Sequence, residues 1–279
     1  MLPRPHFAHL LLSTLTLTLV SCSSGPTPAQ KGTPPYYWQA ARETFAAGDY
    51  MKASEHLSSL VRTQNEFTAR AYPWSLVLNS GMARGSMEIA DAFENGARQS
   101  KANPAPFRRQ ASDFRTKASQ LSLLFLEQFE KFESANKDEK IPLAFPFPTG
   151  NAMPVAELSK AGAGILLQEG EFLSMQRRVV ERAVLMAACR AAGAPEDTAK
   201  AREVFKASAP EVPRAAFMLA MANAVYEQSQ IYSPRKLDQP DRMKLFLKHT
   251  GDILEALPDS KEKADLGKKV QSALKDAPK

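Results

Sequence analysis

The chain has 279 residues, of which 44% are hydrophobic and 24% charged, and this composition is that of an ordinary globular protein with a buried core. At roughly 100–200 residues per domain, the length allows one large domain or two small ones. The formal net charge is +6, but the basic residues alternate with acids, as where Arg177 and Arg178 precede Glu181. Such alternation is typical of solvated helix faces, whereas nucleic-acid binding needs basic residues clustered on one surface, so we expect no nucleic-acid partner.

The N-terminus has the pattern of a secretory leader. After a weakly positive start that contains Arg4, residues 7–20 form an apolar stretch interrupted only by small polar residues and His9. This stretch is too short to cross roughly 30 Å of hydrocarbon as a helix, but it suits the h-region of a signal peptide. We therefore expect residues 1–21 to be a signal peptide.

The four residues Leu19-Val20-Ser21-Cys22 resemble the lipobox of bacterial lipoproteins. The resemblance implies cleavage before Cys22, diacylation of its thiol and acylation of its new amine, and several acyl chains give lasting membrane attachment. In proteobacterial lipoproteins Asp after the cysteine commonly signals inner-membrane retention, so Ser23 favours the outer membrane. We expect a lipid-anchored protein of the bacterial cell envelope that faces the periplasm.

A tether follows the anchor. Residues 22–35 are rich in Ser, Gly, Pro and Thr and lack apolar periodicity, which predicts a flexible linker. If Cys22 is acylated, the second cysteine of the chain, Cys189, has no intrachain partner. Its apolar helical surroundings predict a buried thiol.

Residues 36–277 carry helical periodicity, and the sequence predicts an all-α domain there. A helix pair is expected over 36–47 and 49–62 with Asp49 as N-cap, followed by a long helix over 72–99. The next helix has the clearest apolar seam in the chain, at steps of four and three. The seam consists of Phe107, Ala111, Phe114, Ala118, Leu121, Phe125 and Phe132.

A Pro-rich loop at about 141–154 interrupts the helices, because four prolines and a Gly-Asn pair exclude a regular helix. A helical run from Val155 to about Ala192 is expected to bend near a glycine. Further helices are expected to start after Pro195, with Glu196 in the first turn, and at Pro213, whose helix should be the most buried. The last two helices are marked by an apolar stripe from 243 to 257 and by a cap at Ser260. No segment alternates convincingly as a strand.

Parts of the chain resemble tetratricopeptide (TPR) repeats. The resemblance is carried by Tyr37 and Ala41, then Gly48-Asp49-Tyr50, Ala53, Leu57 and Leu60, with an echo at Trp74, Gly85, Met87, Ala90 and Ala97 and a closing half at Ala201, Phe205 and Pro213. It implies stacked antiparallel helical hairpins that share one core, arranged as a TPR-like α-solenoid or as an irregular helical bundle. The order of lipoprotein signal, linker and degenerate repeats is also similar to the periplasmic T-component of some TRAP transporters.

No catalytic pattern is found. After removal of the signal peptide only His56 and His249 remain, in no zinc-binding arrangement, and no Gly-rich phosphate motif occurs. We expect no metal, no cofactor and no enzymatic activity.

Four aromatic residues are the candidates for partner or ligand binding. Phe145 and Phe147 alternate with prolines in the loop, and Tyr72 and Trp74 open a long helix. Large apolar side chains are costly to expose, so they either fold back onto the helical stack or bind a partner.

Three functions are compatible with the sequence. The first is a non-enzymatic scaffolding lipoprotein that binds an envelope protein or peptide in a helical groove. The second is a small-molecule-binding component that accompanies a TRAP-type transporter, and it requires an apolar pocket with a few convergent polar groups. The third is an envelope enzyme, which requires a cleft with perturbed acids or bases.

Overall fold

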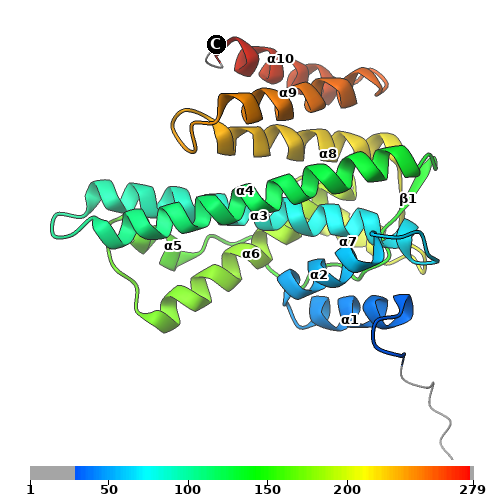
Figure 1. Ribbon diagram of the computed structural model, residues 1–279, viewed down its shortest axis with the longest axis horizontal. Coiled ribbons are helices and arrows are strands. Elements are labelled where there is room, and N and C mark those ends of the chain that lie inside the picture. The colour runs from blue at the N-terminus through cyan, green and yellow to red at the C-terminus, as the bar shows by residue number, and fades with distance from the viewer. Residues whose placement is uncertain (1–28, 277–279) are drawn as a thin grey trace, which may run out of the picture.

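The computed structural model describes residues 29–276 and confirms an all-α fold, since 71% of these residues are helical (Figure 1). The helices are α1 (Pro34–Ala46), α2 (Tyr50–Leu60), α3 (Thr68–Gln99), α4 (Ala105–Ala135), α5 (Ala156–Gly162), α6 (Glu169–Ala191), α7 (Thr198–Phe205), α8 (Arg214–Ser229), α9 (Pro240–Glu255) and α10 (Lys261–Asp276). A short 3-10 helix, η1 (Gln230–Tyr232), and two strands, β1 (Lys140–Pro142) and β2 (Glu211–Pro213), complete the described elements.

The first helix pair forms as the sequence predicts. The Asp49 side chain caps α2 by accepting a hydrogen bond from the backbone N–H of Lys52 at 3.2 Å. Gly48 has a φ of +76°, a conformation that glycine adopts without strain, and it lets the chain reverse between α1 and α2. The rings of Phe45 and Tyr50 then meet across the turn at 5.3 Å between centroids.

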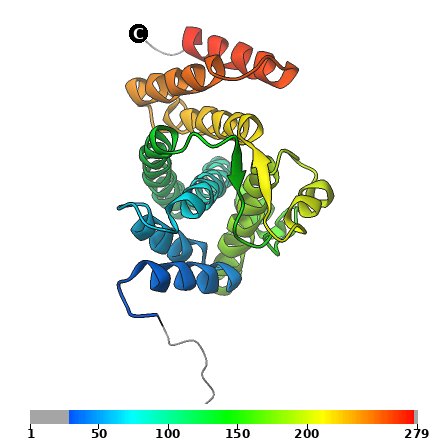
Figure 2. The same ribbon diagram turned by 90° about the vertical axis from the view of Figure 1, so that its right-hand side faces the viewer.

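Helix α3 lies at the centre of the molecule. It contacts α2, α4, α5, α6 and α8, and Figure 2 shows it enclosed by the other helices. Every residue from Ala71 to Met87 is buried except Arg84. The expectation that the helix after Pro213 is the most buried was therefore wrong, because Ser, Gly and Ala on several faces of α3 let neighbours approach it from all sides. The residues Trp74 to Ala97, which echo a repeat in the sequence, lie along this one uninterrupted helix.

Helix α4 packs along α3 through the predicted seam. All seven residues of the seam are buried, and Phe107, Phe125 and Phe132 are completely inaccessible to solvent. The antiparallel pair α3–α4 is the longest in the described chain, and it supplies the frame on which the shorter helices are placed.

The run from Val155 to Ala192 is two helices, where a single bent helix was expected. Helix α5 ends at Gly162, and Gly164 has a φ of +81°. A Cβ atom on Gly164 would lie 2.9 Å from the backbone N of Ser100, so the chain turns tightly against the end of α3. Helix α6 restarts with a capping box between Gln168 and Glu171.

Two smaller expectations also need correction. Helix α7 begins at Thr198 with Asp197 as its N-cap, so Glu196 lies outside the helix, with a φ of +64°. Strands β1 and β2 pair antiparallel with Ile141 opposite Val212, although no strand was expected. Three residues per strand are too few to show alternation in the sequence.

The C-terminal helices α8, α9 and α10 lie one beside the next (Figure 1). Pro213 precedes α8, and the hydroxyl of Ser260 accepts a hydrogen bond from the N–H of Lys263 at the start of α10, both as predicted. Within residues 29–276, no helix combines the length and hydropathy needed to span a bilayer.

Candidate functional site

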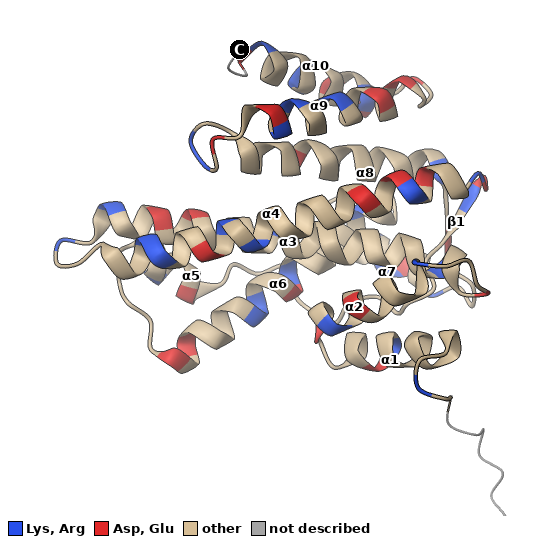
Figure 3. Ribbon diagram, in the orientation of Figure 1, with Lys and Arg blue, Asp and Glu red and all other residues tan. Residues whose placement is uncertain are grey.

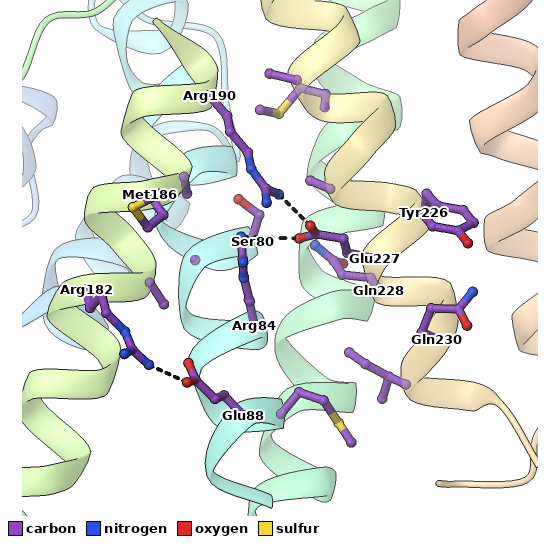
Figure 4. Close-up of a pocket in the computed structure, with 18 of the residues that line it drawn as sticks. Ser80, Arg84, Glu88, Arg182, Met186, Arg190, Tyr226, Glu227, Gln228 and Gln230 are labelled. Atoms are coloured by element: carbon purple, nitrogen blue, oxygen red, sulfur yellow. Dashed lines mark hydrogen bonds and ion pairs between the residues drawn. The ribbon is translucent and has the colours of Figure 1, made fainter. Parts of the chain in front are cut away.

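A cleft of about 660 Å³ opens between α3, α6 and α8 (Figure 4). Pockets for small molecules have volumes of roughly 300–1,000 Å³, so this cleft has the size of a ligand site. Its apolar lining comes mostly from alanine and methionine. The apolar lining residues are Gly81, Met87, Ala152, Ala183, Met186, Ala187, Ala220, Met221, Ala224 and Ile231.

The base of the cleft depends on a close approach of α3 to α6. A Cβ atom added to Gly81 would lie 2.8 Å from the Cα of Val184, and one added to Gly85 would lie 3.2 Å from the Cβ of Ala183. Real side chains do not come this close to a neighbouring backbone, so glycine at 81 fixes the spacing of the two helices. The cleft is therefore built by small residues that hold its walls in place.

Two hydrogen-bonded ion pairs join α6 to the other walls. Arg182 and Arg190 stand eight residues apart on the cleft side of α6, with Met186 between them (Figure 4). Arg182 pairs with Glu88 on α3, and Arg190 donates to the Oε1 atom of Glu227 on α8 at 2.7 Å. Both arginine side chains are more than four-fifths buried. These pairs link α6 to each of the other two walls.

Arg84 differs from the other two arginines. It is the single exposed residue in the buried part of α3, and its side chain is 42% exposed. Its nearest acid is Glu227, at 3.8 Å between Nη1 and Oε2, and it makes no hydrogen bond to the described residues. Since α3 is otherwise enclosed, the cleft is the opening through which this guanidinium meets solvent.

A buried amide also lines the cleft. Gln228 on α8 is only 3% exposed, and neither its Oε1 nor its Nε2 atom has a hydrogen-bond partner among the described residues. Leaving such a group unpaired costs about 1–3 kcal/mol. Figure 4 shows Gln228 and Arg84 extending from α8 and α3 into the space between these helices.

The four aromatic candidates of the sequence lie elsewhere. Trp74 is completely buried and Phe145 almost so, and their rings stack at 5.3 Å between centroids. Tyr72 is buried and donates to the carbonyl oxygen of Val61 at 3.3 Å, whereas Phe147 is half-buried against Phe205 at 5.2 Å. Packing is thus observed for all four, and none of them lines the cleft. Partner binding by these residues stays a prediction.

The remaining candidate residues lie away from the cleft or outside the described residues. Cys189 is fully buried, and burial together with Asp197 raises the pKa of its thiol to about 11. His249 lies 3.2 Å from Glu130 at the surface of α4 and α9. The proposed lipidation site, Cys22, lies outside the described residues. Within residues 29–276, no three His, Cys, Asp or Glu side chains gather as a metal site.

The charged residues of the cleft were missed in the sequence because each looks like an ordinary surface charge. Figure 3 shows acidic and basic residues interspersed over most helices, and nothing local separates Arg84 from the rest. A weak signal existed in α3, where Arg84 is the one charged residue between Arg70 and Glu88. A lone charge in a long stretch without others indicates a position with special surroundings.

The fold and this site define an all-α protein with a ligand-sized cleft between three helices. Comparisons of the chain with protein-family models, with curated proteins and with solved structures gave no match.

Proposed function

We propose that the protein is a non-enzymatic binding lipoprotein of the bacterial envelope, and that the cleft between α3, α6 and α8 binds an envelope protein or peptide. The observation that carries this proposal is Arg84, an exposed cation without a hydrogen bond in a helix that is otherwise buried from Ala71 to Met87. A concave, mostly apolar site with a few convergent polar groups is the form that ligand sites usually take.

The charges of the cleft favour binding over catalysis. Three of its four acids are paired with cations, since Glu88 contacts Arg182, Asp91 contacts Lys236 at 2.9 Å and Glu227 contacts Arg190. Carboxylates engaged in this way hold the walls together. A general acid or base would need a free group within reach of a substrate proton.

Membrane attachment through Cys22 is the second part of the proposal. Residues 22–35 would hold the domain near the periplasmic side of the membrane, with the outer membrane favoured by Ser23. Fractionation of cells tests this part directly. The wild-type chain should sediment with membranes and Cys22→Ser should remain unprocessed, and identical processing of both chains would refute acylation at this residue.

A second candidate is a small-molecule carrier that accompanies a TRAP-type transporter. The cleft volume favours it, because about 660 Å³ lies within the range for small-molecule sites. The two candidates differ in the size and chemistry of the bound species.

Native mass spectrometry of the full chain extracted from its own membranes tests binding in the cleft. Ala187 lines the cleft and is half-buried, so Ala187→Trp would fill the space without entering the core. We expect a bound species on the wild type that is missing from the variant. Identical spectra, with or without a bound species, would refute the cleft as the binding site.

A further inference from the structure

The guanidinium of Arg84, which makes no hydrogen bond to the described residues, is the starting point for the chemistry of the ligand. A guanidinium presents planar N–H donors that match a carboxylate or phosphate in a bidentate arrangement. Arg182 and Arg190 already donate to carboxylates, whereas Arg84 has only Glu227 at 3.8 Å. Arg84 thus has N–H donors that no hydrogen bond to the described residues engages, and they can bind an oxyanion.

Arg84 can turn to a ligand without leaving a carboxylate unpaired. Glu227 is shared between Arg84 and Arg190, and Arg190 holds it by a hydrogen bond of 2.7 Å. Movement of Arg84 away from Glu227 therefore breaks only the longer contact. Glu227, whose side chain is 36% exposed, keeps an ion pair when Arg84 turns to a ligand.

The other charges restrict the oxyanion. Glu88, Asp91, Glu196 and Glu227 line the cleft together with three arginines. Because Lys236 pairs with Asp91, four cations balance the four lining acids, and the cleft has no net positive charge that would attract a dianion such as a phosphate monoester. A single carboxylate is the favoured charge.

The remaining lining suits a peptide next to this carboxylate. Both atoms of the Gln228 amide are unpaired, and an amide side chain can accept from a peptide N–H and donate to a peptide carbonyl. Met87, Met186 and Met221 provide flexible apolar side chains that adapt to different partners.

From these observations we propose that the cleft binds the C-terminal end of a short peptide or polypeptide with an apolar last residue. The terminal carboxylate contacts Arg84, the adjacent peptide group pairs with Gln228, and the last side chain packs on the methionines. This inference rests on the proposed function and specifies its ligand.

Isothermal titration calorimetry of the full chain in detergent tests the proposal with the tripeptide Ala-Ala-Leu. Its C-terminal amide should bind at least about tenfold more weakly, because it lacks the charge that Arg84 recognises. Arg84→Gln should lower the affinity for the free-acid peptide by a similar factor and leave the affinity for the amide unchanged. Arg98→Gln is the matched control, since Arg98 lies on the same helix, is 67% exposed and is remote from the cleft lining. Equal affinity for acid and amide, equal effects of the two variants, or no binding of any form would overturn the proposal.

N-acetylation of the tripeptide distinguishes the two sources of such an end. Weaker binding of the acetylated form assigns the site to free short peptides, whose ammonium group can pair with Glu196 in the lining. Unchanged binding assigns it to the C-terminus of a longer chain.

Gln228→Met separates a ligand role from a structural one. Removing an unpaired buried amide should raise the melting temperature of the free protein. The loss of the peptide contact should lower the affinity for Ala-Ala-Leu several-fold. Lower stability with unchanged affinity would assign Gln228 to packing and refute its part in the proposal.

If no peptide binds while native mass spectrometry still detects a species lost in Ala187→Trp, the ligand chemistry is wrong but the proposed function stands.

Discussion

The spacing between α3 and α6 gives the most direct test of how the cleft is built. Gly81→Ala adds a Cβ atom that would lie 2.8 Å from the Cα and 3.0 Å from the N of Val184, and 3.1 Å from the carbonyl oxygen of Ala183. All three are backbone atoms, so no side-chain rotation relieves the contact. Helix α6 must shift away from α3, and the base of the cleft must change with it.

The size of the effect follows from a matched variant. Gly251 lies in α9 and nothing lies within 4 Å of its added Cβ, so Gly251→Ala should stabilise the protein by about 1 kcal/mol through helix propensity alone. Gly81→Ala has the same propensity gain but also overpacks the interface, which costs about 1–3 kcal/mol. The difference in free energy of unfolding between the two variants therefore measures the contact of the added methyl group with α6, and it should be about 1–3 kcal/mol.

Urea unfolding followed by far-UV circular dichroism measures both free energies. We expect Gly81→Ala to unfold at lower urea than Gly251→Ala, with similar dependence on urea concentration. Equal midpoints would mean that α6 accommodates a methyl group at no cost, and the account of the α3–α6 spacing would then fail.

Three further predictions concern the core. Phe145→Ala should lose about 3–5 kcal/mol of unfolding free energy in urea titration, because a fully buried ring is removed; a loss under about 1 kcal/mol would show that the loop is loosely packed. Gln128→Ala should lose about 1–3 kcal/mol in the same assay, because the buried Nδ2 of Asn79, which now donates to Gln128 at 2.8 Å, loses its acceptor; an unchanged midpoint would argue against this network. Burial raises the pKa of Cys189 from 9.0 to about 11, and burial followed by Glu181 raises that of Tyr50 from 10.0 to about 12. Since the folded state holds these protons more tightly, the free energy of unfolding should not be reduced by either group below about pH 9 and should fall by roughly 3 kcal/mol per group as pH rises through 11 and 12. Tyr50→Phe should make the decline above pH 10 less steep. An identical pH profile for this variant would contradict the prediction.

Local patterns were sufficient for much of the fold. The Asp49 cap, the turn at Gly48 and the start of α10 after Ser260 depend on neighbouring residues, and each is where the sequence predicts it. The apolar seam from Phe107 to Phe132 is also a local signal, because periodicity within one helix determines its buried face.

Features that depend on distant contacts could not be predicted. Strands β1 and β2 pair across the chain between Lys140 and Pro213, and no short window contains both. The break at Gly164 is fixed by the end of α3 at Ser100. The burial of Trp74 and Phe145 arises from a cluster assembled by α1, α3 and the Pro-rich loop.

The cleft is the clearest case of this limit. Arg84, Arg190 and Glu227 come from three helices, and in the sequence each resembles a solvated charge. What makes Arg84 unusual is that α3 is enclosed on its other sides, and this is a property of the assembled fold. Sequence patterns identify which side chains are apolar, but not which polar side chain faces an opening.

Photo-crosslinking in cells tests whether the cleft between α3, α6 and α8 holds a ligand. A photoreactive residue replaces Met186, which lines the cleft, and in a matched strain it replaces Leu274, which is 43% exposed on α10. We expect light-dependent adducts of defined mass at 186 and none of the same mass at 274. Adducts of the same mass at both positions, or no adduct at 186, would contradict binding in the cleft.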